Sequence, residues 1–274
     1  MQQKILDWAK SIEENNVFSP FALYYSHDSP RGGKMFVMEN PGSGGLIEKY
    51  SKELKAENEA YKAWARDLAK NGKASYALLE EFIKCSRECA KSWLIKGNAH
   101  LLEFFKILSE NDIIKTKVTD KKSYDKYIEN DFFQDFWVTD WCKTRFKTDL
   151  EDIIRKEIEW VQPRLVFLFS GYTWQNFYKI YEDKLKPQIQ KQFSEDEIYN
   201  DKRKFKPGIE KMHGHFFTLQ IPHEVGVFPL IHFVGQAYKK HNAIYYPRIR
   251  TLFSAHKEEI QALLSQSMKI KKNL

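Results

Sequence analysis

The run Leu165-Val-Phe-Leu-Phe-Ser-Gly171 decides the fold of this chain of 274 residues. Its first five residues are all apolar, with no alternation of polar and apolar positions. Such a run is typical of a strand that is buried on both faces, as the strands of a parallel sheet are when helices cover both sides. We therefore predict a central β-strand over 165–169 and an α/β fold.

Helices and strands alternate on either side of this run. Ile153, Ile154 and Ile158 recur at helical spacing, which predicts a helix over 150–160 that ends before Pro163. The other elements that we expect are a helix over 172–184, strands over 34–39, 132–139, 216–221 and 228–233, and a closing helix over 248–264. This alternation predicts a mostly parallel sheet with helices between its strands.

Two segments interrupt the pattern. Apolar residues recur at helical spacing from 46 to 110, so we interpret this range as a helical insertion. Residues 184–212 are charged and contain prolines, which predicts a surface excursion. We expect a single domain over 1–274 that includes both segments.

The composition favours a soluble globular protein with a polyanionic partner. The formal net charge is +7 and the pI is about 9.0, which permits DNA binding without establishing it. The apolar runs are too short to span a bilayer and the N-terminus lacks the apolar region of a signal peptide, so we expect a cytoplasmic protein with no membrane partner. Cys85, Cys89 and Cys142 cannot make a full disulfide framework, and we expect them to be core thiols.

The strand over 34–39 runs into a turn that is the strongest candidate for chemistry. The sequence there is Lys34-Met-Phe-Val-Met-Glu-Asn-Pro-Gly-Ser-Gly-Gly45. Pro41 fixes φ and Gly42 accepts positive φ, so the chain reverses sharply and leaves the Asn40 carboxamide at the carboxyl end of a strand. In open α/β sheets, ligands bind in the crevice at this end. An ordinary strand-ending turn is the alternative.

Two further polar residues follow predicted strands. Asp140 comes after the second strand, and His232 lies at the end of the last one. With Asn40, they are three candidates for one crevice. Asp140 is alternatively the cap of a turn or the ion-pair partner of Lys143 or Arg145, and His232 is alternatively a histidine packed in the core.

Three motifs occur in a fixed order along the chain. They are the turn Met38-Glu-Asn-Pro-Gly42, the segment from Glu157 to Gly171 and the triplet Ile231-His-Phe233. The turn resembles the Gly-hydrophobic-Asn-Pro-Gly turn of the mismatch-specific and single-strand-selective branches of the uracil-DNA glycosylase superfamily. The segment is similar to the helix, Pro-Lys, apolar strand and glycine of that superfamily, and the triplet resembles its His-Pro-Ser motif. The resemblance, which covers the chain outside 46–110 and 184–212, implies a three-layer α/β/α fold around a central, mostly parallel, four-stranded sheet.

The resemblance also implies an activity. A monofunctional DNA glycosylase hydrolyses the N-glycosidic bond of a flipped base and leaves an abasic site. Asn40 would orient the water, and His232 would donate to the base as negative charge builds on it, with no metal or organic cofactor. The residues expected around the base are Glu39, Pro41, Gly42, Ser43 and Asp140. The residues expected on a loop that holds double- or single-stranded DNA are Gln236, Tyr238, Lys239 and Lys240.

Three residues depart from the superfamily pattern. Phe233 follows His232 where a proline is usual, and Glu39 replaces a small hydrophobic residue. Asp140 stands where many relatives place the asparagine that reads uracil. Because a carboxylate only accepts hydrogen bonds, it would prefer a base with an amino group, as cytosine has at N4. The substrate hypothesis is therefore a uracil-like or a modified, cytosine-type base, with a role in DNA repair or in defence against modified viral DNA.

Two alternatives remain open. The absence of Pro-Ser after His232 suits a non-catalytic protein that keeps the fold and binds nucleic acid or another partner. The stretch His213-Gly-His215 would place two imidazoles on one face of a strand, as a pair of metal ligands without a third ligand at clear spacing.

Overall fold

The structure is a computed structural model. The residues that the structure describes are 33–38, 76–97, 99–140, 151–199, 205, 207–231 and 236–266, and the single positions 56, 59, 60, 63 and 67. The strands are β1 (Lys34–Met38), β2 (Phe136–Asp140), β3 (Leu165–Phe169), β4 (Phe217–Gln220) and β5 (Glu224–Leu230). The helices in these ranges are α3 (Tyr76–Gly97), α4 (Ala99–Glu110), α5 (Lys121–Asn130), α6 (Phe132–Asp135), α7 (Glu151–Val161), α8 (Gly171–Ile180), α9 (Glu182–Gln192), α10 (Glu195–Ile198), α11 (Ile209–Met212), α12 (Gln236–Ala255) and α13 (Lys257–Ser265).

The strands form one sheet in the order β2-β1-β3-β5-β4. β1, β2, β3 and β5 run parallel, and β4 pairs antiparallel with β5 at one edge. The predicted central strand is β3, residue for residue, and the prediction of a mostly parallel sheet is confirmed. The sheet has five strands, as many as the sequence pattern predicts, whereas the resemblance implies four; the fifth is β4, which forms an antiparallel hairpin with β5 at the edge.

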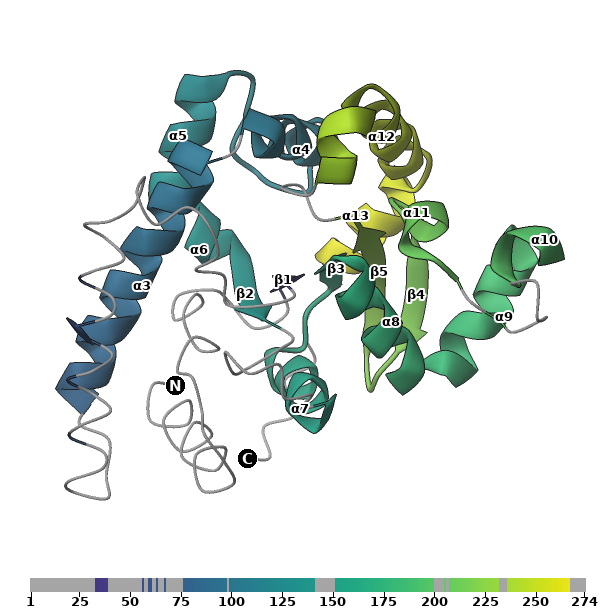
Figure 1. Ribbon diagram of the computed structural model, residues 1–274, viewed down its shortest axis with the longest axis horizontal. Helices are drawn as coiled ribbons and strands as arrows, with labels where there is room; N and C mark the ends of the chain where they lie inside the picture. Colours follow the sequence, from purple (N-terminus) through teal and green to yellow (C-terminus); the bar gives the residue numbers. More distant parts are fainter. Residues whose placement is uncertain are drawn as a thin grey trace.

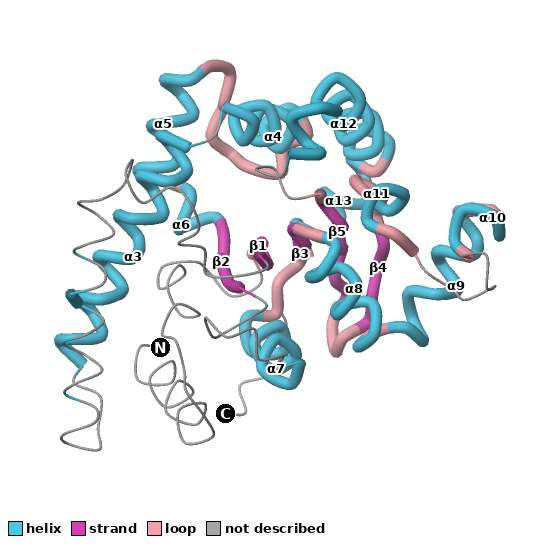
Figure 2. The backbone as a smooth tube through the Cα atoms, in the orientation of Figure 1, coloured by secondary structure: helices cyan, strands magenta, loops and turns pink. Residues whose placement is uncertain are grey.

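Helices cover both faces of the sheet (Figure 1 and Figure 2). On one face, apolar residues of α7, α8 and α9 share one core with Met35 and Val37 of β1 and with the other strands. On the other face, α4, α5, α12 and α13 pack against Phe36 and its neighbours. All five residues of β3 are buried, since both of its faces are covered. This layering explains why β3 is apolar throughout.

Phe36 lies at the centre of an aromatic cluster on the second face. The centroid of its ring is 4.5 Å from that of Phe136 and 4.8 Å from that of Phe169. Phe104 and Phe105 of α4 lie 6.2 Å from it. Stacked and edge-to-face pairs at these distances add to the stabilisation from burial alone. The cluster fixes α4 to the sheet between β2 and β3.

The prediction of a strand over 132–139 is wrong in its first half, where the chain forms the helical turn α6. Phe132 and Phe133 are both buried in the aromatic layer of the second face. Successive residues of a strand point to opposite faces and could not both reach that layer. Asp135 ends the turn and accepts a hydrogen bond from the Tyr127 hydroxyl at 3.0 Å.

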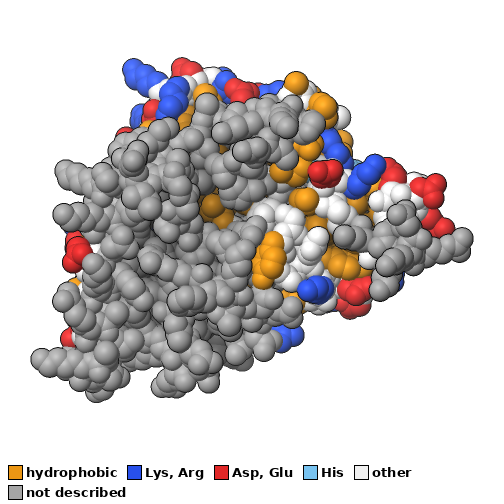
Figure 3. Space-filling view, in the orientation of Figure 1, with side chains coloured by type: hydrophobic (Ala, Val, Ile, Leu, Met, Phe, Trp, Pro, Cys, Tyr) orange, Lys and Arg blue, Asp and Glu red, His pale blue; other side chains and the backbone are white. Residues whose placement is uncertain are grey.

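The helix expected over 172–184 is two helices, α8 and α9, which meet at Tyr181. The segment 184–212 includes most of α9 together with α10 and α11. It lies at the side of the sheet, and Figure 3 shows acidic and basic side chains mixed over α9 and α10 at the right. It is not only a surface excursion, because its apolar residues enter the core of the first face. These residues are Leu185, Ile189, Ile198 and Met212.

Helix α9 also covers the edge of the sheet. Gln188 Nε2 donates to the carbonyl oxygen of Thr218 at 2.6 Å, and the Thr218 N–H donates to Gln188 Oε1 at 3.1 Å. Lys184 Nζ donates to the carbonyl oxygen of Gln220 at 2.7 Å. The side chains of α9 thus take the place of a further strand beside β4, which protects an edge that would otherwise pair with another chain.

The closing helix expected over 248–264 begins earlier and is interrupted. α12 starts well before Pro247 and continues through it, and α13 follows after a break at His256. The expected start at 248 lies inside α12, directly after Pro247, which has no backbone N–H and removes one helical hydrogen bond. In α12 the buried residues Tyr245, Ile249 and Phe253 recur at helical spacing against the sheet, which offsets the missing backbone hydrogen bond.

Helices α3 and α4 fall in the range that we interpret as a helical insertion. α4 and the following α5 belong to the layer on the second face of the sheet. Cys85 on α3 is half-exposed and donates to Glu81 Oε1 at 3.6 Å, so it is not the core thiol that we expected. Ile5, Trp8 and Ile12 recur at helical spacing and predict a helix over 4–14, but this range and most of the range from 46 to 75 lie outside the described residues. None of the helices in the described ranges has the length and apolar character that crossing a bilayer requires.

Candidate active site

The carboxyl ends of the parallel strands lie along one edge of the sheet. Met38 at the end of β1 is opposite Asp140 at the end of β2, and Phe169 of β3 is opposite Leu230 of β5. The chain passes from β1 to β2 on one side and then to β3 on the other, so the strand order reverses between β1 and β3. A reversal of this kind marks the crevice in which open α/β sheets bind ligands.

Asp140 is the last residue of β2, although its side chain lies outside the described residues. Asn40 follows the last residue of β1 by two positions, and His232 follows the last residue of β5 by two. The predicted site residues that lie outside the described ranges are Glu39, Asn40, Pro41, Gly42, Ser43 and His232. Their roles stay predictions.

The residues predicted to hold DNA are on a helix rather than a loop. Gln236, Tyr238, Lys239 and Lys240 form the first turns of α12, so the prediction of a loop there is wrong. These turns contain few apolar positions, and they are helical because they continue into the packed part of α12. The structure describes their backbone only, so their contact with DNA remains a prediction.

Glu157 of α7 makes hydrogen bonds to two side chains near the end of β2. It is buried on α7, and its Oε1 accepts a hydrogen bond from Trp137 Nε1 at 2.6 Å. Its Oε2 accepts from the Thr139 hydroxyl at 3.0 Å. Trp137 and Thr139 are alternate residues of β2 and therefore point to the same face. One carboxyl group thus holds the two positions that lead to Asp140.

Ser170, the residue directly after β3, has an unusual backbone conformation. Its φ is 105°, a region that residues other than glycine rarely adopt, at a cost of about 1–3 kcal/mol. Its N–H donates to the carbonyl oxygen of Leu230 at 2.9 Å, and its Oγ accepts from the N–H of Thr173 at 3.2 Å. The hydroxyl therefore caps α8, whose N-terminus lies at the same edge of the sheet as the strand ends.

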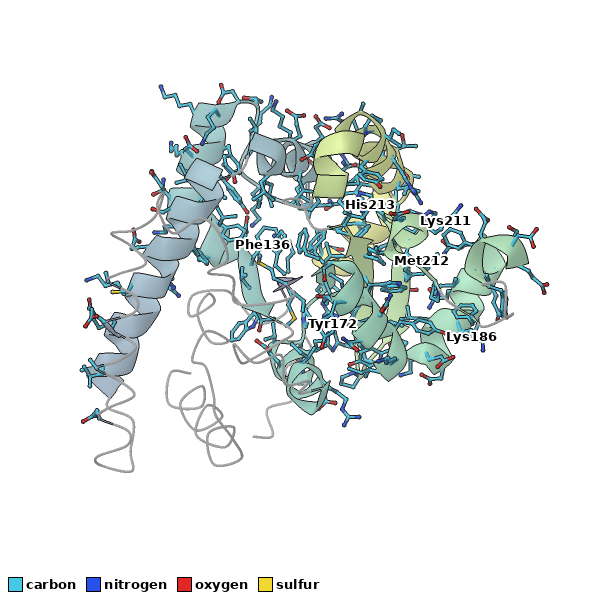
Figure 4. All side chains as sticks on the ribbon, viewed as in Figure 1. Phe136, Tyr172, Lys186, Lys211, Met212 and His213 are labelled. Atoms are coloured by element: carbon cyan, nitrogen blue, oxygen red, sulfur yellow. The ribbon has the colours of Figure 1, made fainter. Side chains whose placement is uncertain are left out.

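His213 lies beside the end of β5, at the end of α11 (Figure 4). It is fully buried, and its Nδ1 accepts a hydrogen bond from the N–H of Ile231 at 3.0 Å. A backbone N–H only donates, so Nδ1 carries no proton and the imidazole is neutral. Burial, with the nearby charge of Arg248, lowers the pKa of His213 to about 3.

The pair His213 and His215 does not form the metal site that we considered. Both residues lie in the turn between α11 and β4, not on one face of a strand, and Nδ1 of His213 is occupied by Ile231. Across the part of the chain that the structure describes, no three His, Cys, Asp or Glu side chains are arranged to hold a metal ion.

Comparison with known proteins does not assign the chain to a family. No protein-family model matches the sequence, and no curated protein matches it. Function is therefore inferred from the chain's own residues and from the motifs described above.

The roles of Glu157, Ser170 and His213 are not predicted from the sequence, although the sequence indicates His213 as a possible metal ligand. The signal for Glu157 was present, since an acidic residue occupies the apolar face of α7 beside Ile154 and Ile158. An acidic residue at a core position usually has a buried polar partner. Ser170 and His213 carried no comparable signal, because their roles depend on residues that are remote in sequence.

One hollow on the described surface is not part of this edge. Its volume is about 890 Å³, and it is lined by α4, the segment after it and Arg250 of α12. Two ion pairs lie along it, Arg250 with Glu110 at 2.7 Å and Lys106 with Glu103 at 2.6 Å. None of its lining residues belongs to a strand.

Proposed function

We propose that this protein is a DNA glycosylase that hydrolyses the N-glycosidic bond of a flipped base at the carboxyl edge of its sheet. The observation that carries the proposal is the strand register. β1 and β2, which lead to Asn40 and Asp140, are hydrogen-bonded neighbours with Met38 opposite Asp140, and β5, which leads to His232, runs parallel to them. Asp140 thus ends β2, and Asn40 and His232 come two positions after strands that end at the same edge.

The distance between the ends of β1 and β5 is comparable with the length of a base together with its sugar. Neighbouring strands lie about 4.8 Å apart, so β1 and β5, which are separated by β3, end about 10 Å apart. This separation is of the order of the length of a nucleoside. We therefore propose that Asn40, which follows β1, contacts the sugar side and that His232, which follows β5, contacts the base.

The reaction needs a positioned water and a group that stabilises the leaving base. Cleavage passes through a sugar with oxocarbenium character while the base departs as an anion. The Asn40 carboxamide accepts a hydrogen bond from the water with its oxygen and directs it at the sugar carbon. The His232 imidazole donates to the exocyclic oxygen of the base as negative charge builds there.

Asp140 bears on the choice of base. A carboxylate at the end of β2 accepts a hydrogen bond from an exocyclic amino group, which cytosine-type bases carry and uracil lacks. We therefore propose a modified, cytosine-type base as the preferred substrate. DNA repair or attack on modified viral DNA are the corresponding roles.

The test is release of a base from defined oligonucleotides. Single- and double-stranded substrates with uracil, hydroxymethylcytosine or other altered bases are incubated with the protein and heated in alkali, which cleaves abasic sites. We expect cleavage, and we expect Asn40→Ala to slow it by about 100-fold or more while DNA binding is unchanged. Asn130→Ala, at the exposed end of α5, is the control and should cleave as the wild type does.

Three results would count against the proposal. Unchanged cleavage by Asn40→Ala removes this residue from the mechanism. Excision of uracil without release of any cytosine derivative refutes the assignment of Asp140. Salt-sensitive DNA binding without any base release would support a non-catalytic nucleic-acid-binding protein, which the residues after His232 also allow.

A further inference from the structure

His213 continues the antiparallel pairing of β4 with β5 by means of its side chain. The register pairs Phe217 with Val227, and extending it by the same steps places position 213 opposite Ile231. The backbone has left the ladder by then, because Gly214 has a φ of +80° and lies in a turn. At position 213 the imidazole supplies the acceptor that a strand carbonyl would otherwise provide.

The end of β5 is consequently held on both sides. On the side of β3, the N–H of Ser170, the residue after that strand, donates to the carbonyl oxygen of Leu230 at 2.9 Å. From the turn before β4, the N–H of Gly214 donates to the carbonyl oxygen of Pro229 at 2.8 Å, and Nδ1 of His213 accepts from the N–H of Ile231 at 3.0 Å. The last of these bonds fixes the residue directly before His232.

Helix α12 holds His213 in turn. The ring of Tyr245 lies edge-on to the imidazole, with centroids 5.0 Å apart and an angle of 76° between the planes. Arg248 donates to the carbonyl oxygens of Glu210, at 3.0 Å, and of Lys211, at the end of α11. His213 therefore contacts the strand that leads into the segment 232–235 and the helix that follows it.

We propose that His213 is a positioning residue for His232, and this inference rests on the glycosylase activity proposed above. Without the acceptor at Nδ1, the backbone at Ile231 loses the bond that orients it. His232 is the next residue, so we expect the hydrogen bond proposed for it with the base to weaken. A misplaced donor stabilises the departing base less, whereas binding of the rest of the DNA is unaffected, so the loss appears in kcat rather than in KM.

Two variants with side chains of one shape test the inference. In asparagine, Oδ1 stands at the same number of bonds from Cβ as Nδ1 does in histidine, and it accepts a hydrogen bond. In leucine, a methyl group stands there. We expect His213→Leu to lower kcat by about tenfold or more with KM unchanged, and His213→Asn to restore most of the rate. His223→Asn, in the turn at the opposite end of β5, is the control and should keep the wild-type rate.

Amide hydrogen exchange gives a readout that does not depend on activity. In His213→Leu, the amide of Ile231 should exchange faster than in the wild type, while the amides of Val225, Gly226, Val227, Phe228 and Leu230 in β5 keep their protection. If the leucine variant does not fold, His213→Gln replaces it, because its acceptor lies one bond too far and the same slow reaction is expected.

The possible outcomes distinguish failure of the positioning role of His213 from failure of the proposed glycosylase activity. Equal kcat values for the wild type, His213→Asn and His213→Leu on an active enzyme would overturn the positioning role and leave the glycosylase proposal intact. A rise in KM alone would also overturn it. A wild-type protein that releases no base overturns both.

Discussion

Glu157 on α7 and Trp137 on β2 are joined by a hydrogen bond of 2.6 Å between the carboxyl Oε1 and the indole Nε1, and both side chains are buried. The second oxygen of the same carboxyl group accepts from the Thr139 hydroxyl. A single side chain thus ties the helix on the first face to the strand that ends at Asp140. Because buried donors lose water on folding, this acceptor stabilises both of them.

Replacement of Glu157 by leucine should destabilise the protein. The change leaves Trp137 Nε1 and the Thr139 hydroxyl without the acceptors seen here, and we expect the free energy of unfolding to fall by about 3 kcal/mol. Glu157→Gln retains one acceptor oxygen and should cost less. Urea unfolding measures both values, with Glu159→Gln on the exposed side of α7 as the control. Equal stability of the leucine variant and the wild type would show that neither bond matters.

The elements that the sequence predicts well are those set by local pattern. β3 was predicted to the residue, because a run of five apolar positions without alternation is too short for a helix and is typical of a strand buried on both faces. The errors arise where tertiary packing decides. Phe132 and Phe133 have high strand propensity, yet both are needed in one aromatic layer, and the chain turns as α6 to place them there. Pro247 lies inside α12 because the apolar face of that helix continues on both sides of it.

The candidate site was predictable only in part. The position of Asp140 at the carboxyl edge of the sheet is predictable, because it follows from the position of one strand alone. The contacts behind that edge join residues that are distant in sequence, such as Glu157 with Trp137 and His213 with Ile231. No periodicity within one segment encodes which remote residue will face a buried polar group.

Acid should destabilise the protein through His213. Its pKa in the folded state is lowered to about 3, mainly because burial disfavours the charged imidazole, whereas in the unfolded chain it is near 6.5. Between these two values the unfolded state binds a proton that the folded state does not. The stabilisation is therefore complete above pH 6.5 and is lost as the pH falls toward 3, by about 1.4 kcal/mol per pH unit.

His213→Asn removes this dependence, because asparagine does not titrate. The difference in unfolding free energy between pH 7 and pH 5, measured in urea, should be about 2 kcal/mol smaller in the variant than in the wild type. His215 has its pKa lowered to about 4 by burial and contributes the same trend in both proteins. An identical pH dependence in the two proteins would contradict the assignment of a neutral, buried His213.

Gln188 should matter both for stability and for solubility. Gln188→Ala removes the two hydrogen bonds that its carboxamide makes with the backbone of Thr218, and we expect a loss of about 1–2 kcal/mol in urea unfolding. The N–H and carbonyl groups of β4 are then open to pairing with another molecule, so sedimentation should show self-association that increases with protein concentration. Gln192→Ala, on an exposed residue at the end of α9, should change neither property.

Gly226 is a position where even one methyl group should be costly. A Cβ atom there would lie 2.5 Å from Cε2 of Phe216 and 2.8 Å from Cδ2 of Leu165, and these residues are buried in the second-face core. Real Cβ contacts are not this short, so the core must shift, and Gly226→Ala should lower the free energy of unfolding by about 3 kcal/mol. Gly208→Ala is the matched control, since a Cβ at that position meets nothing within 4 Å and we expect a loss of no more than about 1 kcal/mol. If urea unfolding gives the two alanine variants the same midpoint, the packing of β5 between Phe216 and Leu165 is looser than these distances require.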